Sequence, residues 1–273
     1  MNTTGEKAPK PFLKWAGGKG QLLGQYGPLF PRRFGRYHEP FVGGGAVFFH
    51  LLPPRATLSD ANAELVDCFV AVRDDVNAVI RTLGRHRYEK DYYYAVRAQD
   101  PAKLEPAARA ARTIFLNRTG FNGLYRVNSK GGFNVPFGRY ANPTICDAPN
   151  LRACARVLRR ATILQAPFAS ILERARRDDF VYFDPPYQPL SKTAYFTAYG
   201  AGGFREDDQR ELARVYAALD RRGVLVMLSN SDTPLTRELY RGFRVVEVQA
   251  TRAINSKAAR RGAITELVAL NYR

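Results

Sequence analysis

The tetrapeptide DPPY at 184–187 combines residue types that can bind a flat ring carrying an amino group. It follows an apolar run at 180–183, which is typical of a strand buried on both faces. Open α/β sheets bind ligands at the carboxyl ends of such strands. Because prolines provide no N–H donors, the Asp184 carboxylate and the Pro185 carbonyl form an acceptor-rich corner beside an aromatic ring. The pattern predicts a site for a planar heterocycle with an exocyclic NH2 group, and an ordinary turn is the alternative.

A glycine-rich segment at 39–45 (EPFVGGG) indicates a second binding element. Asp60 follows it at the end of the next expected strand. Glycines let a ligand approach the backbone, and an acid at the following strand end can bind ribose hydroxyls. The run lacks the GxGxxG pattern of pyrophosphate binding, which favours a nucleoside. The alternative is a turn followed by an acid that caps a helix.

The third motif, KWAGGK at 14–19, contains the only tryptophan of the chain. Two lysines and two glycines are compatible with a phosphate loop, but the GxxxxGK[ST] spacing is absent. A core tryptophan in a turn is the alternative interpretation.

The charge balance points to a polyanionic partner. The chain has 42 Lys and Arg against 25 Asp and Glu, a net charge of +17. Between residues 109 and 160 there are ten basic residues and one acid, a local net charge of +9, interleaved with aromatic residues. Basic groups for phosphates and aromatic rings for bases are what a nucleic-acid surface needs. A merely basic surface is the alternative.

Composition excludes several other classes of protein. Apolar residues make up 45% and charged residues 25% of the 273 residues, as in a globular protein. We expect no membrane span and no signal peptide, because no long apolar run is present. Three cysteines without CxxC spacing and three scattered histidines predict neither disulfides nor a metal site, and favour a reducing compartment.

Alternating strands and helices at both ends of the chain predict an α/β doubly wound, mostly parallel sheet. The middle of the chain lacks this alternation and is interpreted as an inserted helical and β-hairpin domain. We therefore expect one discontinuous domain at 9–62 and 151–273, and an inserted domain at 63–150. Strands are expected at 36–41, 56–60, 180–183, 224–228, 244–248 and 266–272. Helices are expected at 46–52, 62–83, 107–117 and 206–222, with helical stretches in 151–177 and a hairpin in 123–137.

The order of these motifs resembles that of the Dam-like, D12 class DNA adenine-N6 methyltransferases. The resemblance is carried by KWAGGK, EPFVGGG, a strand-end acid and DPPY, and it spans about residues 10–273. It continues at 117–124 (NRTGFNGL), 133–138 (FNVPFG), 193–199 (TAYFTAY), 229–233 (SNSDT) and 266–272 (ELVALNY). Departures are modest: GGG stands where GAG is common, Phe121 where tyrosine is frequent, and SNSDT where SNHDT is common.

The resemblance implies a Rossmann-like fold of the class I methyltransferases and S-adenosylmethionine as methyl donor, without a metal. Matching motifs assign the donor site to Trp15, Ala16, Lys19, Phe41, Gly43, Gly45, Asp60, Phe168 and Asp184. Within this set Asp60 is assigned to the ribose hydroxyls and Phe168 to the adenine of the donor. The catalytic residues implied are Asp184, Pro185, Pro186 and Tyr187.

The segment 117–139 resembles the part of the family's recognition domain that reads double-stranded DNA, and GATC is the implied target. The DNA-binding residues implied are Phe121, Asn122, Leu124, Arg126, Lys130, Pro136 and Arg139. Phe121 resembles an inserted wedge. Arg126 is the candidate for reading guanine through O6 and N7, with a phosphate contact as the alternative. Further phosphate contacts are expected at Lys257, Arg260 and Arg261, in a loop (252–265) that is either a flap or a solvated charged segment.

Methylation of N6 in duplex DNA requires the adenine to leave the base stack, so we expect base flipping. Alternatives are an RNA or protein N-methyltransferase on the same scaffold, which often has Asn in place of Asp184, and cytosine-N4 methylation, which usually has Ser there. A non-catalytic DNA-binding module is a further alternative. We expect the protein to be a monomer and to act in the cytoplasm of a bacterium. Its gene is expected to be bacterial or carried by a phage.

Overall fold

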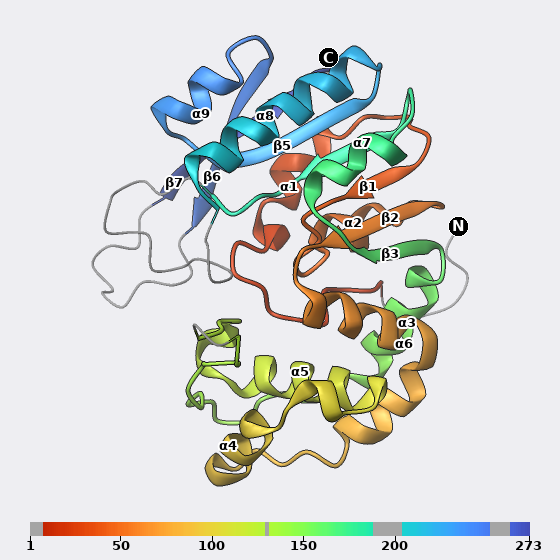
Figure 1. The fold of residues 1–273 in the computed structure, drawn as a ribbon, viewed down its shortest axis with the longest axis vertical. Coiled ribbons are helices and arrows are strands. Elements are labelled where there is room, and N and C mark those ends of the chain that lie inside the picture. Colours follow the sequence, from red (N-terminus) through yellow and green to blue (C-terminus); the bar gives the residue numbers. More distant parts are fainter. Residues whose placement is uncertain (1–7, 129–130, 188–203, 252–262) are drawn as a thin grey trace. The chain divides into compact units, whose positions relative to one another are not determined.

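The computed structural model describes residues 8–128, 131–187, 204–251 and 263–273. Within these ranges the chain forms an α/β fold with a seven-stranded sheet of strand order β3-β2-β1-β4-β5-β7-β6 (Figure 1). The strands are β1 Tyr37–Glu39, β2 Ala56–Asp60, β3 Ala161–Gln165, β4 Phe180–Phe183, β5 Leu225–Ser231, β6 Arg244–Thr251 and β7 Ala263–Leu270.

The centre of the sheet is parallel and its end is antiparallel. Strand β1 pairs in parallel with β2 and β4, and β4 pairs in parallel with β5. Strand β7 runs antiparallel between β5 and β6. The expected mostly parallel α/β sheet is confirmed. Because the carboxyl ends of β1, β2 and β4 face the same edge, that edge collects the residues that follow these strands.

The described residues divide into two compact units. The sheet unit comprises 19–42, 53–61 and 166–273, and the helical unit comprises 1–18, 43–52 and 62–165. The chain passes between the units after Gly18 and after Val42. These bounds differ from the expected domains in that 9–18, 43–52, Asn62 and 151–165 belong to the unit that contains 63–150. The functional assignment of the expected domains stays a prediction.

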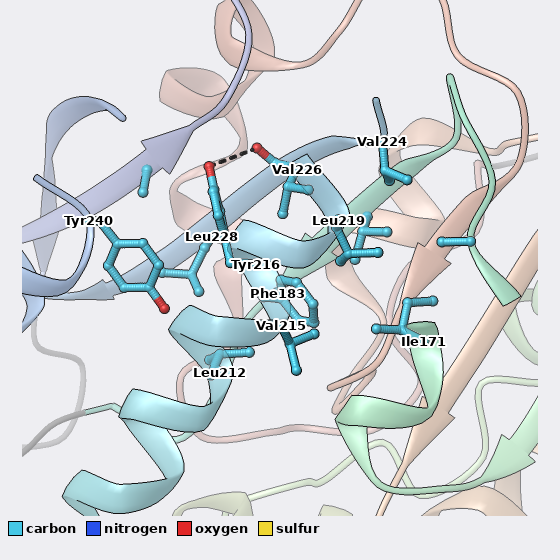
Figure 2. Close-up of a cluster of buried hydrophobic side chains, with 13 residues drawn as sticks. Ile171, Phe183, Leu212, Val215, Tyr216, Leu219, Val224, Val226, Leu228 and Tyr240 are labelled. Atoms are coloured by element: carbon cyan, nitrogen blue, oxygen red, sulfur yellow. Dashed lines mark hydrogen bonds between the residues drawn. The ribbon is translucent and has the colours of Figure 1, made fainter. Parts of the chain in front are cut away.

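A buried hydrophobic cluster holds the strands of the sheet unit (Figure 2). Helix α8 (Glu206–Arg221) contributes Leu212, Tyr216 and Leu219, which pack against residues of β4 and β5. The Tyr216 hydroxyl donates a hydrogen bond to the Val226 carbonyl at 3.3 Å. Each buried large side chain contributes about 1.5–3 kcal/mol. This packing holds β4 in place, and with it the start of the segment that follows β4.

The helical unit is built on α3 (Ala63–Leu83) and α5 (Pro106–Thr119), which pack along each other. The Phe12 ring lies 4.9 Å from that of Phe69, so the N-terminal segment is anchored on α3. The Asn62 side chain caps α3 by accepting a hydrogen bond from the Leu65 amide at 3.1 Å. The unit also contains α2 Ala46–Leu51, α4 Lys90–Ala98 and α6 Ala148–Leu158.

Most expected elements are present. The stretch 151–177 contains the expected helical residues, in α6 and α7, and also the strand β3, which was not expected. The hairpin at 123–137 is reduced, in the described residues, to isolated bridges such as Val127 with Phe133. The helix α4 lies between the expected helices at 62–83 and 107–117, in a region for which the sequence pattern predicts no element. The remaining helices are α1 Leu23–Tyr26, α7 Ile171–Arg174 and α9 Pro234–Leu239, with five short 3-10 helices. Of the helices described, none has the length and apolarity needed to cross a bilayer.

Candidate active site and nucleic-acid segment

The Asp184 carboxylate lies just beyond the end of β4, in the sheet unit. Since Phe183 is paired with Leu228, the next residues along both strands, Asp184 and Ser229, lie side by side. The Ser229 hydroxyl donates to Asp184 Oδ1 at 3.0 Å. The Lys19 ammonium lies 2.7 Å from the same oxygen, and the two side chains of this ion pair are 4% and 20% exposed. Asp184 is therefore held in a fixed orientation.

Lys19 and Ser229 both contact Oδ1 of Asp184, so the second carboxylate oxygen, Oδ2, is left for another donor. Among the described residues, Asp184 Oδ2 and the Pro185 carbonyl accept no hydrogen bond. The Pro186 carbonyl, in contrast, accepts from Gln209 Nε2 at 3.1 Å. Gln209 is fully buried and accepts in turn from Asn230 Nδ2 at 2.9 Å. The predicted acceptor corner thus consists of Asp184 Oδ2 and the Pro185 oxygen.

Two side chains hold the Tyr187 ring: Glu266 binds its hydroxyl, and Lys19 lies over its face. Its hydroxyl donates to Glu266 Oε2 at 2.6 Å. The Lys19 ammonium lies 4.6 Å from the ring centroid, which is a cation–π geometry. Glu266 lies on β7, opposite Ser231 of β5. A strand far along the chain therefore fixes the ring of the DPPY motif.

Burial shifts the acid–base behaviour of this cluster. Burial raises the pKa of Asp184 above its ordinary value, although the Lys19 ammonium and the Ser229 hydroxyl both act to lower it. Burial also raises the pKa of Glu266; Lys19 and the Tyr187 hydroxyl oppose that shift, and Asp184 adds to it. The pKa of Tyr187 lies well above its ordinary value for the same reason, burial near acids. The tyrosine hydroxyl is therefore a donor.

The donor residues expected in the sheet unit also lie near strand ends. Phe41 follows β1 and stacks on Phe168, with ring centroids 5.4 Å apart. Asp60 ends β2, and its carbonyl accepts from the Ala166 amide at 3.1 Å, two residues before Phe168. The alternative in which Asp60 caps the following helix is wrong, because Asn62 is the cap. Flat aromatic rings and a carboxylate suit the adenine and ribose of a nucleoside.

The donor residues expected in the helical unit form a tight turn around the tryptophan. Gly43 and Gly45 adopt φ values of +46° and +69°, which favour glycine. A Cβ atom at Gly43 would lie 2.8 Å from Trp15 Cδ1, so the indole lies directly on the glycine turn. Trp15 and Ala16 are half-buried. Glycine is therefore needed at position 43 both for the backbone conformation and for the close approach of the indole.

Asn117 joins the KWAGGK motif to the segment 117–139. Its Nδ2 donates to the carbonyls of Lys14 and Gly123 at 2.7 and 3.0 Å, and its Oδ1 accepts from the Lys14 amide at 2.7 Å. The Tyr125 ring stacks on Trp15 with centroids 5.2 Å apart. These contacts explain why Asn117 is buried, and they place Trp15 beside the segment expected to read DNA.

The expected DNA-binding residues are mostly on the surface of the helical unit. Phe121 is 48% exposed although it is a large apolar residue. A hollow of about 400 Å³ is lined by Phe121, Asn122, Pro136, Phe137, Arg139 and Tyr140. Leu124 is half-buried. The Arg126 guanidinium donates twice to the Asn134 carbonyl, at 3.1 and 2.7 Å. Lys130, Lys257, Arg260 and Arg261 lie outside the described residues.

Sequence reasoning assigned no role to several supporting residues. Glu266, Ser229 and Asn117 each lie inside a motif that carries the family resemblance, and that was the only signal for them. Gln209 lies in none of these motifs, and no sequence pattern indicated its contact with Pro186. Within the described residues, no group of three or more His, Cys, Asp or Glu side chains is arranged to hold a metal.

Comparison with known proteins decides the family. The model of the D12 class N6 adenine-specific DNA methyltransferases matches residues 15–254. The chain belongs to this family.

Relatives of this methyltransferase match it over nearly their whole length. A type II methyltransferase of Lactococcus lactis subsp. cremoris, M1.LlaDCHI, is 44% identical, over 96% of this chain and 95% of the relative. The type II methyltransferase M.MjaIII of Methanocaldococcus jannaschii is also 44% identical, over 96% and 99%. A DNA adenine methylase of Escherichia coli K12 is 38% identical, over 97% and 96%. The protein is thus an adenine-specific DNA methyltransferase, and its family implies S-adenosylmethionine as donor.

Proposed function

We propose that this methyltransferase transfers the methyl group of S-adenosylmethionine to N6 of adenine within GATC in double-stranded DNA, after the base has been flipped out. One observation carries the proposal. Asp184 is anchored through Oδ1 by Lys19 and Ser229, while Oδ2 and the Pro185 carbonyl accept no hydrogen bond from the described residues. Two acceptors next to the Tyr187 ring match an adenine and its two N6 hydrogens.

In this mechanism Asp184 Oδ2 and the Pro185 oxygen accept the two hydrogens of the amino group. These bonds pull the nitrogen lone pair out of conjugation with the ring and favour positive charge on N6. The adenine stacks on the face of Tyr187 opposite Lys19. Positioning of this kind supplies much of the rate in reactions of two bound partners.

The chemistry of the step balances without an added catalyst. When bound, S-adenosylmethionine supplies a methyl group activated by its sulfonium. The N6 lone pair forms the new N–C bond, the S–C bond breaks, and its electrons remain on sulfur. The alkylated nitrogen then loses a proton to Asp184 or to water. Asp184 needs no strongly basic pKa for this role, because the cationic nitrogen is acidic.

The proposed donor residues divide their work by chemistry. Phe41 and Phe168 are stacked on each other and provide flat apolar surface for the donor adenine. Asp60, half-buried at the end of β2, would bind the ribose hydroxyls. The turn of Gly43 and Gly45 beside Trp15 and Ala16, together with Lys19, would contact the remainder of the donor.

The proposed reading of DNA rests on the exposed residues of 117–139. Phe121 would enter the space left by the flipped adenine. Asn122, Pro136 and Arg139, which line the hollow, would contact bases and phosphates together with Leu124, and Lys130 would contact the phosphates. For Arg126 to read a guanine, its guanidinium must exchange the Asn134 carbonyl for O6 and N7.

The first experiment is methyl transfer from labelled S-adenosylmethionine to plasmid DNA. The DNA is then digested with nucleases that differ in their sensitivity to GATC methylation. Label in N6-methyladenine with altered GATC digestion is the expected result. Label in N6-methyladenine with unaltered digestion would remove GATC as the target and keep the chemistry.

Variants of Asp184 separate the enzyme from its alternatives. Asp184→Ala is expected to abolish transfer while donor binding, followed by calorimetry, persists in part. A module that only binds DNA would lose nothing measurable. Transfer of label to RNA or protein, and none to DNA, would favour the other substrate classes. Flipping is tested by the fluorescence of 2-aminopurine at the target position, which should rise on binding.

We also propose that the protein acts as a monomer in a reducing compartment such as the bacterial cytoplasm. The three cysteines are free in the structure, which supports the second part. Light scattering during gel filtration, alone and with a short GATC duplex, tests the first part.

A further inference from the structure

The hydroxyl of Tyr187 makes a partly buried hydrogen bond that the transfer step itself does not use. It donates to Glu266 Oε2 at 2.6 Å, across 79 residues of chain. Both residues belong to the sheet unit. A hydrogen bond to a carboxylate at this length is of the charge-assisted kind, about twice as strong as a neutral one. Glu266 is half-buried, and removing a carboxylate partly from water costs free energy that its bond with the Tyr187 hydroxyl offsets in part.

The backbone around Glu266 is fixed by the sheet. Strand β7 is paired on both sides, with Ser231 of β5 and Val248 of β6 opposite Glu266. The Tyr187 backbone, in contrast, follows a strand end after two prolines. The hydrogen bond of the hydroxyl therefore links the Tyr187 ring, which lies on a connecting segment, to β7, a strand that is paired on both sides.

A second contact acts on the same ring. Lys19 pairs with Asp184 at 2.7 Å and lies 4.6 Å from the Tyr187 ring centroid. Rotation of the ring out of this position would lose the Glu266 bond and the Lys19 contact together. The plane of the ring and the direction of Asp184 Oδ2 are thus set by one connected group of side chains.

We propose that Glu266 is a positioning residue for methyl transfer, which acts through the Tyr187 hydroxyl to hold the ring in the plane on which the target adenine stacks. The proposal rests on the stacking role of Tyr187 in the proposed function. Glu266 does not touch the substrate. Its effect appears only in the step in which adenine N6 must lie in line with the methyl group.

The test is a double-mutant cycle with Glu266→Ala, Glu266→Gln, Tyr187→Phe and the two double variants. The transfer rate constant is measured in a single turnover at saturating donor and DNA. We expect Glu266→Ala to lower it about tenfold, as for the loss of a hydrogen bond to a charged group. Glu266→Gln keeps an acceptor oxygen and should lose about threefold.

In the Tyr187→Phe background both Glu266 substitutions should change the rate by less than about twofold, because the hydroxyl through which they act is gone. Donor affinity, measured by calorimetry, should stay within about twofold of the wild type in every variant. Damage to the fold would instead lower donor affinity and thermal stability along with the rate.

The matched control is Glu247→Gln on β6. Glu247 is an exposed carboxylate of the neighbouring strand, paired with Arg237 at 2.6 Å, and it has no contact with Tyr187. Its substitution should leave transfer unchanged. If Glu266→Ala is unfolded, the isosteric Glu266→Gln and the Tyr187→Phe variant still complete a cycle.

Two results would overturn the inference. One is a full rate in Glu266→Ala; the other is a loss that persists undiminished in the Tyr187→Phe background. Tyr187→Ala separates this failure from failure of the proposed function. If Tyr187→Ala is inactive while Glu266→Ala is active, only the positioning role is wrong. If Tyr187→Ala keeps the full rate, the stacking role of the tyrosine is wrong as well.

Discussion

Replacing Lys19 with methionine should shift the pH at which this methyltransferase becomes active. The substitution keeps the length of the side chain and removes the ammonium that lies 2.7 Å from Asp184 Oδ1. Lys19 favours the charged carboxylate, while burial already raises the pKa of Asp184. Without the ammonium the pKa must rise further. A protonated Asp184 cannot accept both from Ser229 and from an amino hydrogen as the carboxylate does.

The size of the shift follows from the geometry. Two unit charges 2.7 Å apart attract by about 6 kcal/mol at an effective dielectric constant of about 20. Loss of one partner of a buried pair typically costs about 3–5 kcal/mol. Asp184 is one-fifth exposed and keeps the Ser229 bond, so we take the lower end. About 3 kcal/mol corresponds to roughly two pKa units.

The assay is the single-turnover transfer rate from pH 5 to 9, at donor and DNA concentrations that saturate both proteins. Saturation removes any effect of Lys19 on donor affinity. The midpoint of the acidic limb should lie about two pH units higher in Lys19→Met than in the wild type. Lys103→Met, which removes an exposed lysine of a 3-10 helix, should leave it in place. An unchanged midpoint with only a lower plateau would refute the electrostatic role of Lys19.

Three further predictions concern stability. Burial lowers the pKa values of His38 and His86; below about pH 6.5 the unfolded chain therefore binds more protons, and the unfolding free energy should fall as the pH falls from 6.5 towards the folded values. Urea denaturation between pH 5 and 7.5 should show this slope, less steep in His38→Gln, and a flat profile would contradict it. Asn117→Ala should lower the unfolding free energy in urea by about 2–4 kcal/mol, because three hydrogen bonds to the backbone are lost, of which the one to Gly123 is buried; a cost below 1 kcal/mol would show that the contacts with Lys14 are dispensable. Gly43→Ala should cost about 1–3 kcal/mol and alter the fluorescence of the single tryptophan, since its φ is +46° and its Cβ would meet Trp15 at 2.8 Å. Gly27→Ala, where a Cβ meets nothing within 4 Å, is the control.

The parts of the fold that local patterns control were predictable from the sequence. The strands at 56–60 and 180–183 match β2 and β4, because each is a short run of strand-forming residues that the structure buries almost completely. The strand β3 was missed because its five residues follow directly on the helical pattern of α6. The helix α4 was missed because tyrosines dominate it and only Tyr93 and Val96 mark a buried face.

The candidate site was predictable as a set of residues and not as a set of contacts. The residues alone pointed to Asp184 and to the expectation that its carboxylate acts as a hydrogen-bond acceptor. Tyr187 and Glu266 are 79 residues apart in the sequence. Their contact depends on the register of β7 against β5, which no short window of sequence determines. The Asn117 clamp on Lys14 spans 103 residues. No periodicity within a short window encodes such contacts; they come from the packing of the whole unit.

The antiparallel position of β7 also bears on how the protein is made. Strand β6 occupies the end of the described sheet, and its neighbour there is β7, which follows it in the chain. While the ribosome is still adding β7, β6 has no strand to pair with, and Tyr187 has no Glu266 to bind. The parallel strands β1, β2, β4 and β5 are already available for pairing by then. In the order of synthesis, the parallel strands therefore come first, and the bond that holds the Tyr187 ring can form only after β7 has been added.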